Sequence, residues 1–109
     1  MSTDDQDDLI FKALSHRIRR RMLDVLKTEP ATTGTLCSAF PELDRCTIMQ
    51  HLGVLEAAGL VIAERRGRER WNHLDALPVH AIHERWIGPY AAYAASMFSR
   101  LEKNLALSE

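Results

Sequence analysis

Residues 43–60, LDRCTIMQHLGVLEAAGL, decide the fold of this chain. Ile48, Leu52 and Leu55 recur at helical spacing and predict a helix with one buried face. The opposite face is a line of small or uncharged residues, namely Cys46, Gln50, Gly53 and Ala57. One face of this helix is therefore expected to pack inside the protein, and the other to face outward.

The outward face of this helix is slim, in the sense that its side chains are short. Exposed helix surfaces usually carry long charged side chains, but here Gly53 lies in mid-helix, at a cost of roughly 1 kcal/mol relative to Ala. Asp44 can cap the first turn, and Gly59 ends the helix before residues 60–62, which favour a strand. A helix that enters the major groove of DNA has this character, with hydrogen-bonding side chains in its first half and an apolar rear face.

Length and composition predict one modest domain. The chain has 109 residues, 46% of them hydrophobic, and we expect a flexible acidic tail at residues 1–8 and a single domain at residues 9–109. The sequence contains neither an apolar run of membrane-spanning length nor a signal-peptide pattern, so we predict a cytoplasmic protein. Cys37 and Cys46 do not form a secreted-type framework and are expected to be reduced thiols.

The net charge of −1 hides an uneven distribution. Residues 1–8 hold four Asp and no basic residue, whereas residues 9–74 hold eleven Lys or Arg against seven Asp or Glu. Because the basic excess lies around the slim helix, nucleic acid is a compatible partner.

The flanking segments predict a mainly α fold with a small β-hairpin. Three helices precede the slim helix: residues 9–14, residues 17–28, and a short helix capped by Thr32 or Thr33. Two strands follow, at residues 60–66 and 68–74, joined at Gly67. The inward strand positions are expected at Val61, Ala63, Trp71 and His73. The order α-α-α-α-β-β-α-α is that of a winged helix-turn-helix, with the hairpin as the wing.

Two further helices are predicted after the hairpin. Asp75 caps the first, and Gly88 with Pro89 interrupts it before the last helix restarts. The last helix carries an apolar stripe wider than a small subunit can cover, which indicates a homodimer. We expect the dimer interface to contain Tyr90, Ala94, Met97, Leu101 and Leu105.

Several motifs together carry a family resemblance. They lie at residues 11–15, 19–23, 32–34, 47–55, 58–61 and 66–68, and with them the chain resembles the ArsR family of bacterial winged helix-turn-helix regulators. The resemblance implies a dimeric transcriptional repressor that binds double-stranded DNA. It also implies that the first and last helices build the dimer, which would place Leu9 and Ile10 in the interface beside the residues of the last helix. Residues 45–58 would form the DNA-reading helix.

The resemblance also bears on metals. Family members that sense arsenic or cadmium use a cysteine pair near the third helix, where this chain has only Cys37, and zinc sensors use His on the last helix, where this chain has none after Pro89. We therefore predict a branch that senses no metal, with no cofactor and no metal site. His80, His83 and Glu84 share a helical face at ligand-like spacing, so a zinc site there is the alternative. The sequence identifies no small-molecule effector.

The predicted DNA contacts of the recognition helix come from Arg45, Cys46, Thr47, Met49, Gln50 and His51. Gln50 can pair bidentately with adenine, and Arg45 can reach guanine or phosphate. His51 borders the buried face, which leaves both packing and phosphate contact open.

The hairpin supplies further contacts. Strand alternation sends Arg66 and Arg68 to the tip, so we favour these two as DNA contacts over Arg65 and Arg70. Thr32 and Thr33 are predicted as weaker contacts to the DNA backbone.

The sequence also allows functions other than DNA binding. The same helix could dock on a partner protein, and oxidation of Cys46 could make a repressor thiol-responsive. The sequence has no phosphate loop, nucleophile elbow or HExxH motif, so we do not predict an enzyme.

Overall fold

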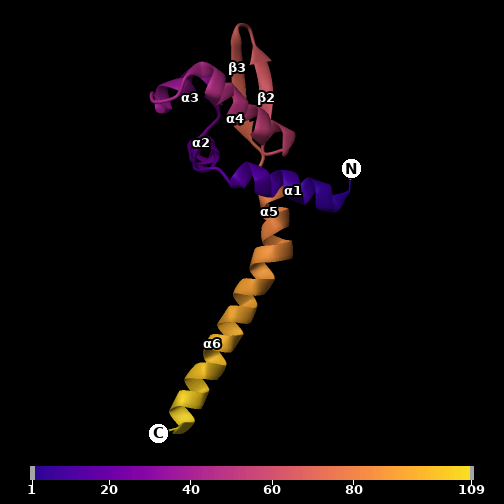
Figure 1. The fold of residues 1–109 in the computed structure, drawn as a ribbon, viewed down its shortest axis with the longest axis vertical. Helices are drawn as coiled ribbons and strands as arrows, with labels where there is room; N and C mark the ends of the chain where they lie inside the picture. Colours follow the sequence, from indigo (N-terminus) through magenta and orange to yellow (C-terminus); the bar gives the residue numbers. More distant parts are fainter. Residues whose placement is uncertain (1, 109) are drawn as a thin grey trace. The chain divides into compact units, whose positions relative to one another are not determined.

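The computed structural model describes residues 2–108, which form two compact units (Figure 1). The first unit ends at Pro78 and the second begins at Val79, whereas we predicted a single domain over residues 9–109. The elements in chain order are α1 (Thr3–Leu14), α2 (Arg17–Thr28), β1 (Ala31–Thr32), α3 (Thr33–Ala39), α4 (Arg45–Ala57), β2 (Val61–Arg66), β3 (Glu69–Leu74), α5 (Leu77–Ile82), a π-helical turn η1 (His83–Ile87) and α6 (Gly88–Ser108). This order confirms the mainly α, winged helix-turn-helix fold and adds the short strand β1.

Helix α1 begins at Thr3 and not at Leu9, so the prediction of a flexible tail is wrong for residues 3–8. Ser2 and Asp5 form a capping box, in which the Asp5 backbone N–H donates to the Ser2 hydroxyl at 3.2 Å and the Ser2 backbone N–H donates to the Asp5 carboxylate at 3.4 Å. The acidic residues then stabilise the first helical turn, because a helix N-terminus favours negative charge. The acidic composition of residues 1–8 predicts disorder, whereas the spacing of Ser2 and Asp5 is that of a helix start.

The core of the first unit lies under α4. Ile48, Leu52 and Leu55 are fully buried, as their spacing predicted. The other buried apolar residues come from α1, α2, α3, β2 and the residues next to them, and include Ala13, Ile18, Met22, Leu26, Leu36, Phe40, Leu60 and Val61. Burial of each large side chain contributes roughly 1.5–3 kcal/mol relative to exposure, so this face fixes which side of α4 points outward.

Helix α4 ends at a Schellman motif. Gly59 has φ +77°, the Gly59 N–H donates to Glu56 O at 3.0 Å, and the Leu60 N–H donates to Leu55 O at 2.9 Å. A second link comes from α1, where the Gln6 side-chain amide donates to Ala58 O at 3.2 Å. The end of α4 is therefore set both by its own sequence and by α1.

The sheet has the strand order β1-β3-β2, with both pairings antiparallel. Gly67, at φ +61°, and Arg68 form a two-residue turn between β2 and β3. In the resulting register Ala63 faces Asn72 and Glu64 faces Trp71. Asn72 is buried, so the prediction of Trp71 and His73 as inward positions is wrong, because the side chains that share a face with Val61 and Ala63 are the even-numbered ones of β3.

In the second unit, the helix continues through the predicted interruption at Gly88 and Pro89. The turn η1 widens the helix so that the Gly88 N–H donates to His83 O, and α6 continues from there. Residues 89–106 are all exposed, and a large part of that surface is apolar. Within the described part of the chain, no helix is both long and apolar enough to cross a lipid bilayer.

Two glycines of the α4 segment should respond oppositely to substitution by alanine. Gly59→Ala is expected to lower the free energy of unfolding by about 1–2 kcal/mol, since its positive φ disfavours a side chain. Gly53→Ala is expected to raise it by about 0.5–1 kcal/mol, because a Cβ there meets no atom within 4 Å and Ala favours helix. Urea denaturation measures both, and a stabilised Gly59→Ala would contradict the assigned helix end.

Candidate nucleic-acid interface

The outward face of α4 carries the predicted DNA-reading side chains. Arg45, Cys46, Met49 and Gln50 are exposed, and Gly53 adds no bulk among them. Since nothing in the subunit lies near enough to a Cβ at Gly53 to exclude it, packing within the subunit does not explain a glycine at this position.

The first turn of α4 is fixed by its cap. The Thr47 N–H donates to Asp44 Oδ1 at 2.7 Å, and hydrogen bonds from the Thr47 backbone and side chain hold the pKa of Asp44 below its usual value. Thr47 is half-buried and engaged with this cap. Of the predicted contacts in this turn, Arg45 and Cys46 are therefore more accessible than Thr47.

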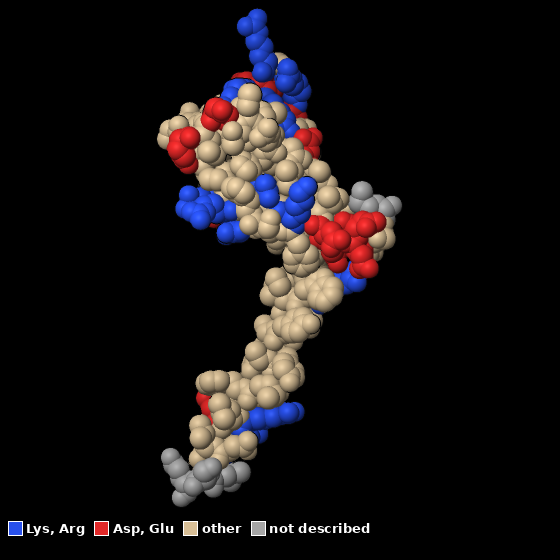
Figure 2. Space-filling view, viewed as in Figure 1, with Lys and Arg blue, Asp and Glu red and all other residues tan. Residues whose placement is uncertain are grey.

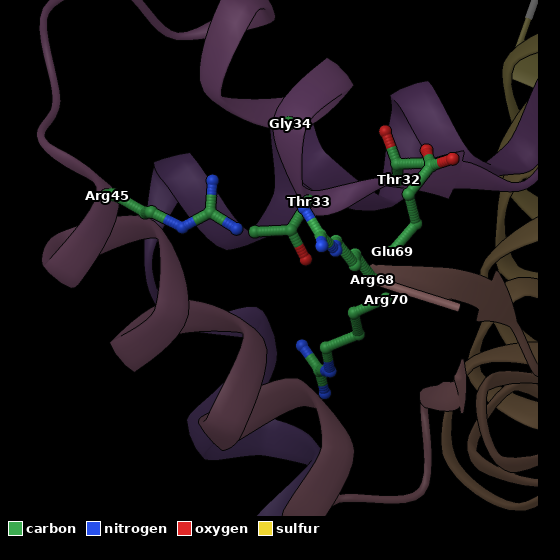
Figure 3. Close-up of a pocket in the computed structure, with 7 residues that line it drawn as sticks. All are labelled: Thr32, Thr33, Gly34, Arg45, Arg68, Glu69 and Arg70. Atoms are coloured by element: carbon green, nitrogen blue, oxygen red, sulfur yellow. The ribbon is translucent and has the colours of Figure 1, made fainter. Parts of the chain in front are cut away.

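A basic hollow of about 220 Å³ lies beside the start of α4. Figure 3 shows Arg45 extending from α4 toward Thr33, with Arg68 and Arg70 entering from the hairpin. The lining residues are Thr32, Thr33, Gly34, Arg45, Arg68, Glu69 and Arg70. Three guanidinium groups against one carboxylate make the hollow attractive to an anion such as a phosphate group.

Arg70 contributes more to this hollow than the sequence indicated. Its Nη2 donates to Glu56 Oε2 of α4 at 2.6 Å, and its side chain is only 15% exposed. Its Nη1 is buried and has no hydrogen-bond partner among the described residues. The signal for Arg70 was the two-residue turn, which fixes the register and places Arg70 on the same sheet face as Asn72.

Thr32 and Thr33 have different roles. Thr32 caps α3, its hydroxyl accepting from the Thr35 N–H at 3.0 Å. Thr33 is 1% exposed, and its hydroxyl oxygen accepts from the buried Asn72 amide at 3.3 Å, while the same amide donates to Ala31 O at 3.1 Å. The prediction of Thr33 as a DNA-backbone contact is therefore wrong for its side chain, which joins α3 to β3.

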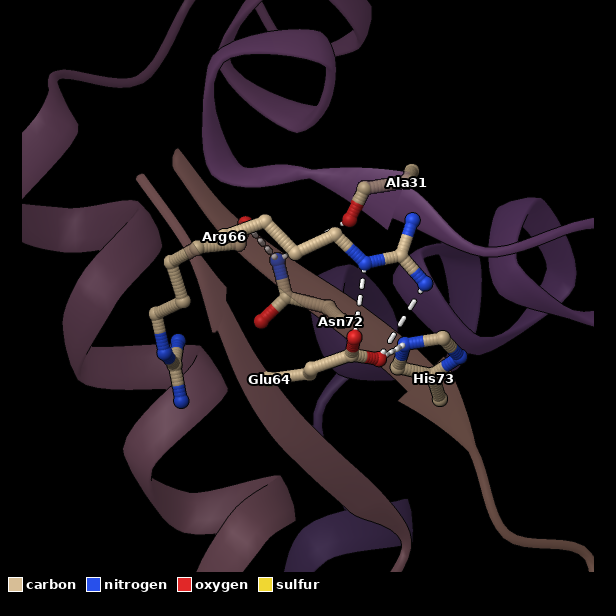
Figure 4. A network of polar contacts seen from close by, with 6 residues as sticks. Ala31, Glu64, Arg66, Asn72 and His73 are labelled. Carbon is tan, nitrogen blue, oxygen red and sulfur yellow. Dashed lines mark hydrogen bonds and ion pairs between the residues drawn. The ribbon is translucent and has the colours of Figure 1, made fainter. Parts of the chain in front are cut away.

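The two predicted wing arginines also differ. Arg66 donates to both oxygens of Glu64, at 2.6 and 3.3 Å, and its guanidinium lies 5.1 Å from the centre of the Trp71 ring. Figure 4 shows His73 on the same Glu64 carboxylate, at 2.9 Å. The Arg66 hydrogen bond, with His73 adding to it, lowers the pKa of Glu64. Arg68 lines the basic hollow instead, so it is the wing residue directed toward α4.

Surface charge agrees with this arrangement of the hairpin. In Figure 2, Lys and Arg atoms gather at the hairpin end of the first unit, whereas Asp and Glu atoms cluster around the start of α1. The recognition face itself is flanked by cations and contains few charged groups.

His51 does not lie on the outward face. It is half-buried, its ring centre lies 4.6 Å from that of His16, and its Nδ1 lies 3.3 Å from Arg19 Nη1. Of the two interpretations left open for His51, the structure favours packing within the subunit.

The histidines and cysteines considered for a metal or thiol site have the following surroundings. His83 Nδ1 lies 3.8 Å from Glu84 Oε1, and no group of three or more His, Cys, Asp or Glu side chains suited to a metal occurs within residues 2–108. Cys37 is half-buried and Cys46 exposed, and both are free thiols.

Comparisons with known proteins agree with the fold. A helix-turn-helix domain model matches residues 14–63. The HTH-type transcriptional regulator YuzN of Bacillus subtilis is 36% identical over 86 residues, covering 73% of this chain and 94% of that protein. The solved structure of an ArsR family transcriptional regulator superposes with a TM-score of 0.76 at 28% identity, covering 87% of this chain and 96% of the other. The chain belongs to the ArsR family of helix-turn-helix transcriptional regulators.

Two further similarities cover less of the relatives. The transcriptional repressor SdpR of Bacillus subtilis is 34% identical over 59 residues, covering 54% of this chain and 64% of that protein. The chain spans about half the length of the curated Mycobacterium tuberculosis regulators that it matches.

Replacement of Thr33 by valine tests its assignment to the core. Thr33→Val keeps the shape but removes an acceptor of the Asn72 amide, so we expect the free energy of unfolding to fall by about 1–2 kcal/mol. DNA affinity of the folded protein should stay unchanged. A variant of unaltered stability with weakened DNA binding would instead place Thr33 in contact with the DNA backbone.

Proposed function

We propose that the protein is a homodimeric transcriptional repressor that binds an inverted-repeat DNA operator through α4. The observation that carries this proposal is the slim, exposed face of α4 beside the hollow formed by Arg45, Arg68 and Arg70. Two copies of α4 would enter successive major grooves, and the hairpins would contact the flanking backbone. Bound in this way, the dimer would obstruct transcription initiation, a role supported by similarity to the repressor SdpR.

Base recognition is assigned to the exposed side chains of α4. The Gln50 amide can donate to and accept from the edge of adenine, and Arg45 can donate to guanine. Met49 and Cys46 are small or flexible enough to contact the thymine methyl group. Gly53 allows the helix axis to approach the floor of the groove.

Phosphate contact is assigned to the basic hollow. Arg68 and Arg45 present donors to a phosphate group, and Arg70, whose Nη1 is buried, adds positive charge to the same wall while it is paired with Glu56. Arg66 is the weaker candidate, because it is bound to both oxygens of Glu64 and is not among the residues that line the hollow. Thr32 remains a proposed contact to the DNA backbone at the edge of the hollow.

The proposed dimer interface is the apolar surface of α6. Tyr90, Met97, Leu101 and Leu105 are 44–65% exposed in the isolated chain, a surface that a second copy of the same helix can bury. Ala94 lies in this row, and Leu9 of α1 is half-buried and also available. Ile10 is 2% exposed in the core of the first unit, so its predicted place in the interface is wrong.

The operator can be obtained by selection of duplexes from a randomised DNA pool, followed by footprinting. The proposal expects an enriched inverted repeat and an affinity that falls steeply with salt, as phosphate neutralisation requires. A shallow salt dependence without an enriched sequence would instead favour the alternative in which α4 docks on a partner protein.

Two substitutions should separate base contact from phosphate contact. Gln50→Ala is expected to relax sequence preference at one operator position by roughly 1–3 kcal/mol, because the amide reads a base edge. Arg68→Ala is expected to weaken binding to all sequences alike and to reduce the salt slope by about 1. Affinity measured on the operator and its single-base variants checks both, and an identical effect of the two substitutions would contradict the assignment.

A charge placed on α6 should dissociate the dimer. Leu101→Glu would bury an unpaired carboxylate in the proposed interface, so we expect monomers and a large loss of operator affinity. Sedimentation equilibrium gives the oligomeric state. Arg100→Glu is the matched control, because it introduces the same side chain beside the apolar row and should leave the dimer intact. A Leu101→Glu protein that remained a stable dimer would refute this interface.

A further inference from the structure

The corner between α1 and α2 holds a side-chain cluster that the DNA-facing surface does not use. Arg19 donates from Nε to Ala13 O and from Nη2 to Lys12 O, both at 2.9 Å. Both carbonyls belong to the last turn of α1, where a cation is favoured. The remaining nitrogen, Nη1, lies 3.3 Å from His51 Nδ1 on α4. One guanidinium group therefore joins the end of α1 to the recognition helix.

The donors in this cluster fix the protonation of two histidines. Arginine has only donors, so His51 Nδ1 must accept, which requires a neutral ring with its proton on Nε2. His16 caps α2 in the same way, its Nδ1 accepting from the Ile18 N–H at 3.1 Å. Protonation of either ring turns the accepting Nδ1 into a donor and removes the hydrogen bond.

The surroundings of His51 oppose a positive charge. The ring of His51 faces His16 from the corner and Arg19 from α2, and the Arg19 guanidinium is bound to two carbonyls at the end of α1. Burial, followed by repulsion from His16 once that ring is charged and from Arg19, lowers the pKa of His51 below its usual value of 6.5. As the pH falls, His51 is therefore protonated in the unfolded chain before it is protonated in the folded protein. The contribution of neutral His51 to the free energy of unfolding is complete above pH 6.5 and is lost as the pH falls through the lowered pKa.

We propose that His16, Arg19 and His51 form a proton-sensitive contact that positions the recognition helix. With both rings neutral, α4 is held against the helix corner at mid-length, in addition to the Gln6 link at its end. Protonation breaks both accepted hydrogen bonds and sets two charged rings beside the Arg19 guanidinium. Acidification then loosens α4 and lowers DNA affinity, a consequence that rests on the proposed function.

The expected sign separates this contact from ordinary electrostatics. Protonation of exposed histidines adds positive charge, and a histidine that touched phosphate would bind it more tightly when charged, so both effects raise DNA affinity in acid. A fall in affinity with falling pH is specific to loss of the contact.

Asparagine provides a matched replacement for both rings. Its side-chain oxygen can accept in place of Nδ1, it is a preferred N-cap residue, and it does not titrate. The variants His16→Asn, His51→Asn and their combination therefore keep the acceptors and remove the proton dependence. Circular dichroism at pH 7.5 checks that each variant folds.

The DNA probe is a duplex enriched from a randomised pool at pH 7.5. The experiment measures the affinity of each protein for this duplex between pH 7.5 and pH 5.5, at fixed ionic strength. We expect wild-type affinity to fall about fivefold or more relative to the double variant, since one linked proton allows up to about tenfold per pH unit. Parallel profiles of the two proteins, or a wild-type affinity that rises in acid relative to the double variant, would overturn the proposal.

Amide hydrogen exchange of the free protein tests the contact without DNA. After normalisation for intrinsic rates, α4 of the wild type should exchange faster at pH 5.5 than α4 of the double variant, and equally at pH 7.5. Equal protection at both pH values would overturn the contact even if DNA binding were pH-dependent. Failure to enrich any duplex would reject the proposed function, while the exchange result would still decide on the contact.

Discussion

Burial of the apolar face of α4 is the constraint on which the rest of the structure depends. Ile48, Leu52 and Leu55 are fully buried among residues from the other helices and from β2, and because a helix has a fixed periodicity, their burial forces Cys46, Gln50 and Gly53 outward. Rotation of α4 would expose three large apolar side chains. The recognition face is thus a consequence of core packing.

Polar contacts determine where α4 begins and ends and which elements it is tied to. The core determines the rotation of α4 about its own axis. Asp44 starts the helix, the Schellman motif at Gly59 ends it, and Gln6 and Arg19 tie it to α1 and to the corner. The pair Glu56 and Arg70 links the hairpin to the same helix. Since Arg70 also lines the basic hollow, one residue couples the position of the wing to the position of the anion-attracting surface.

Charge is arranged locally in this protein, which explains how a chain of net charge −1 can attract DNA. The acidic residues of α1 support its first turn, so they form part of a helix and do not act as a free tail. On the hairpin, Glu64 pairs with Arg66, and Glu56 of α4 pairs with Arg70, while Arg68 and Arg45 complete the basic lining of the hollow. Net charge is therefore a poor guide to the potential at the proposed interface.

The sequence by itself determined the helix-turn-helix, the two ends of α4 and the turn at Gly67, because caps, periodicity and positive-φ glycines are local properties. It did not determine β1, the burial of Thr33 and Asn72, or the roles of Arg70 and His51. Those depend on strand register and on which side chains from distant segments meet. A one-residue choice of register exchanges the two faces of a strand, and only the packed structure makes that choice.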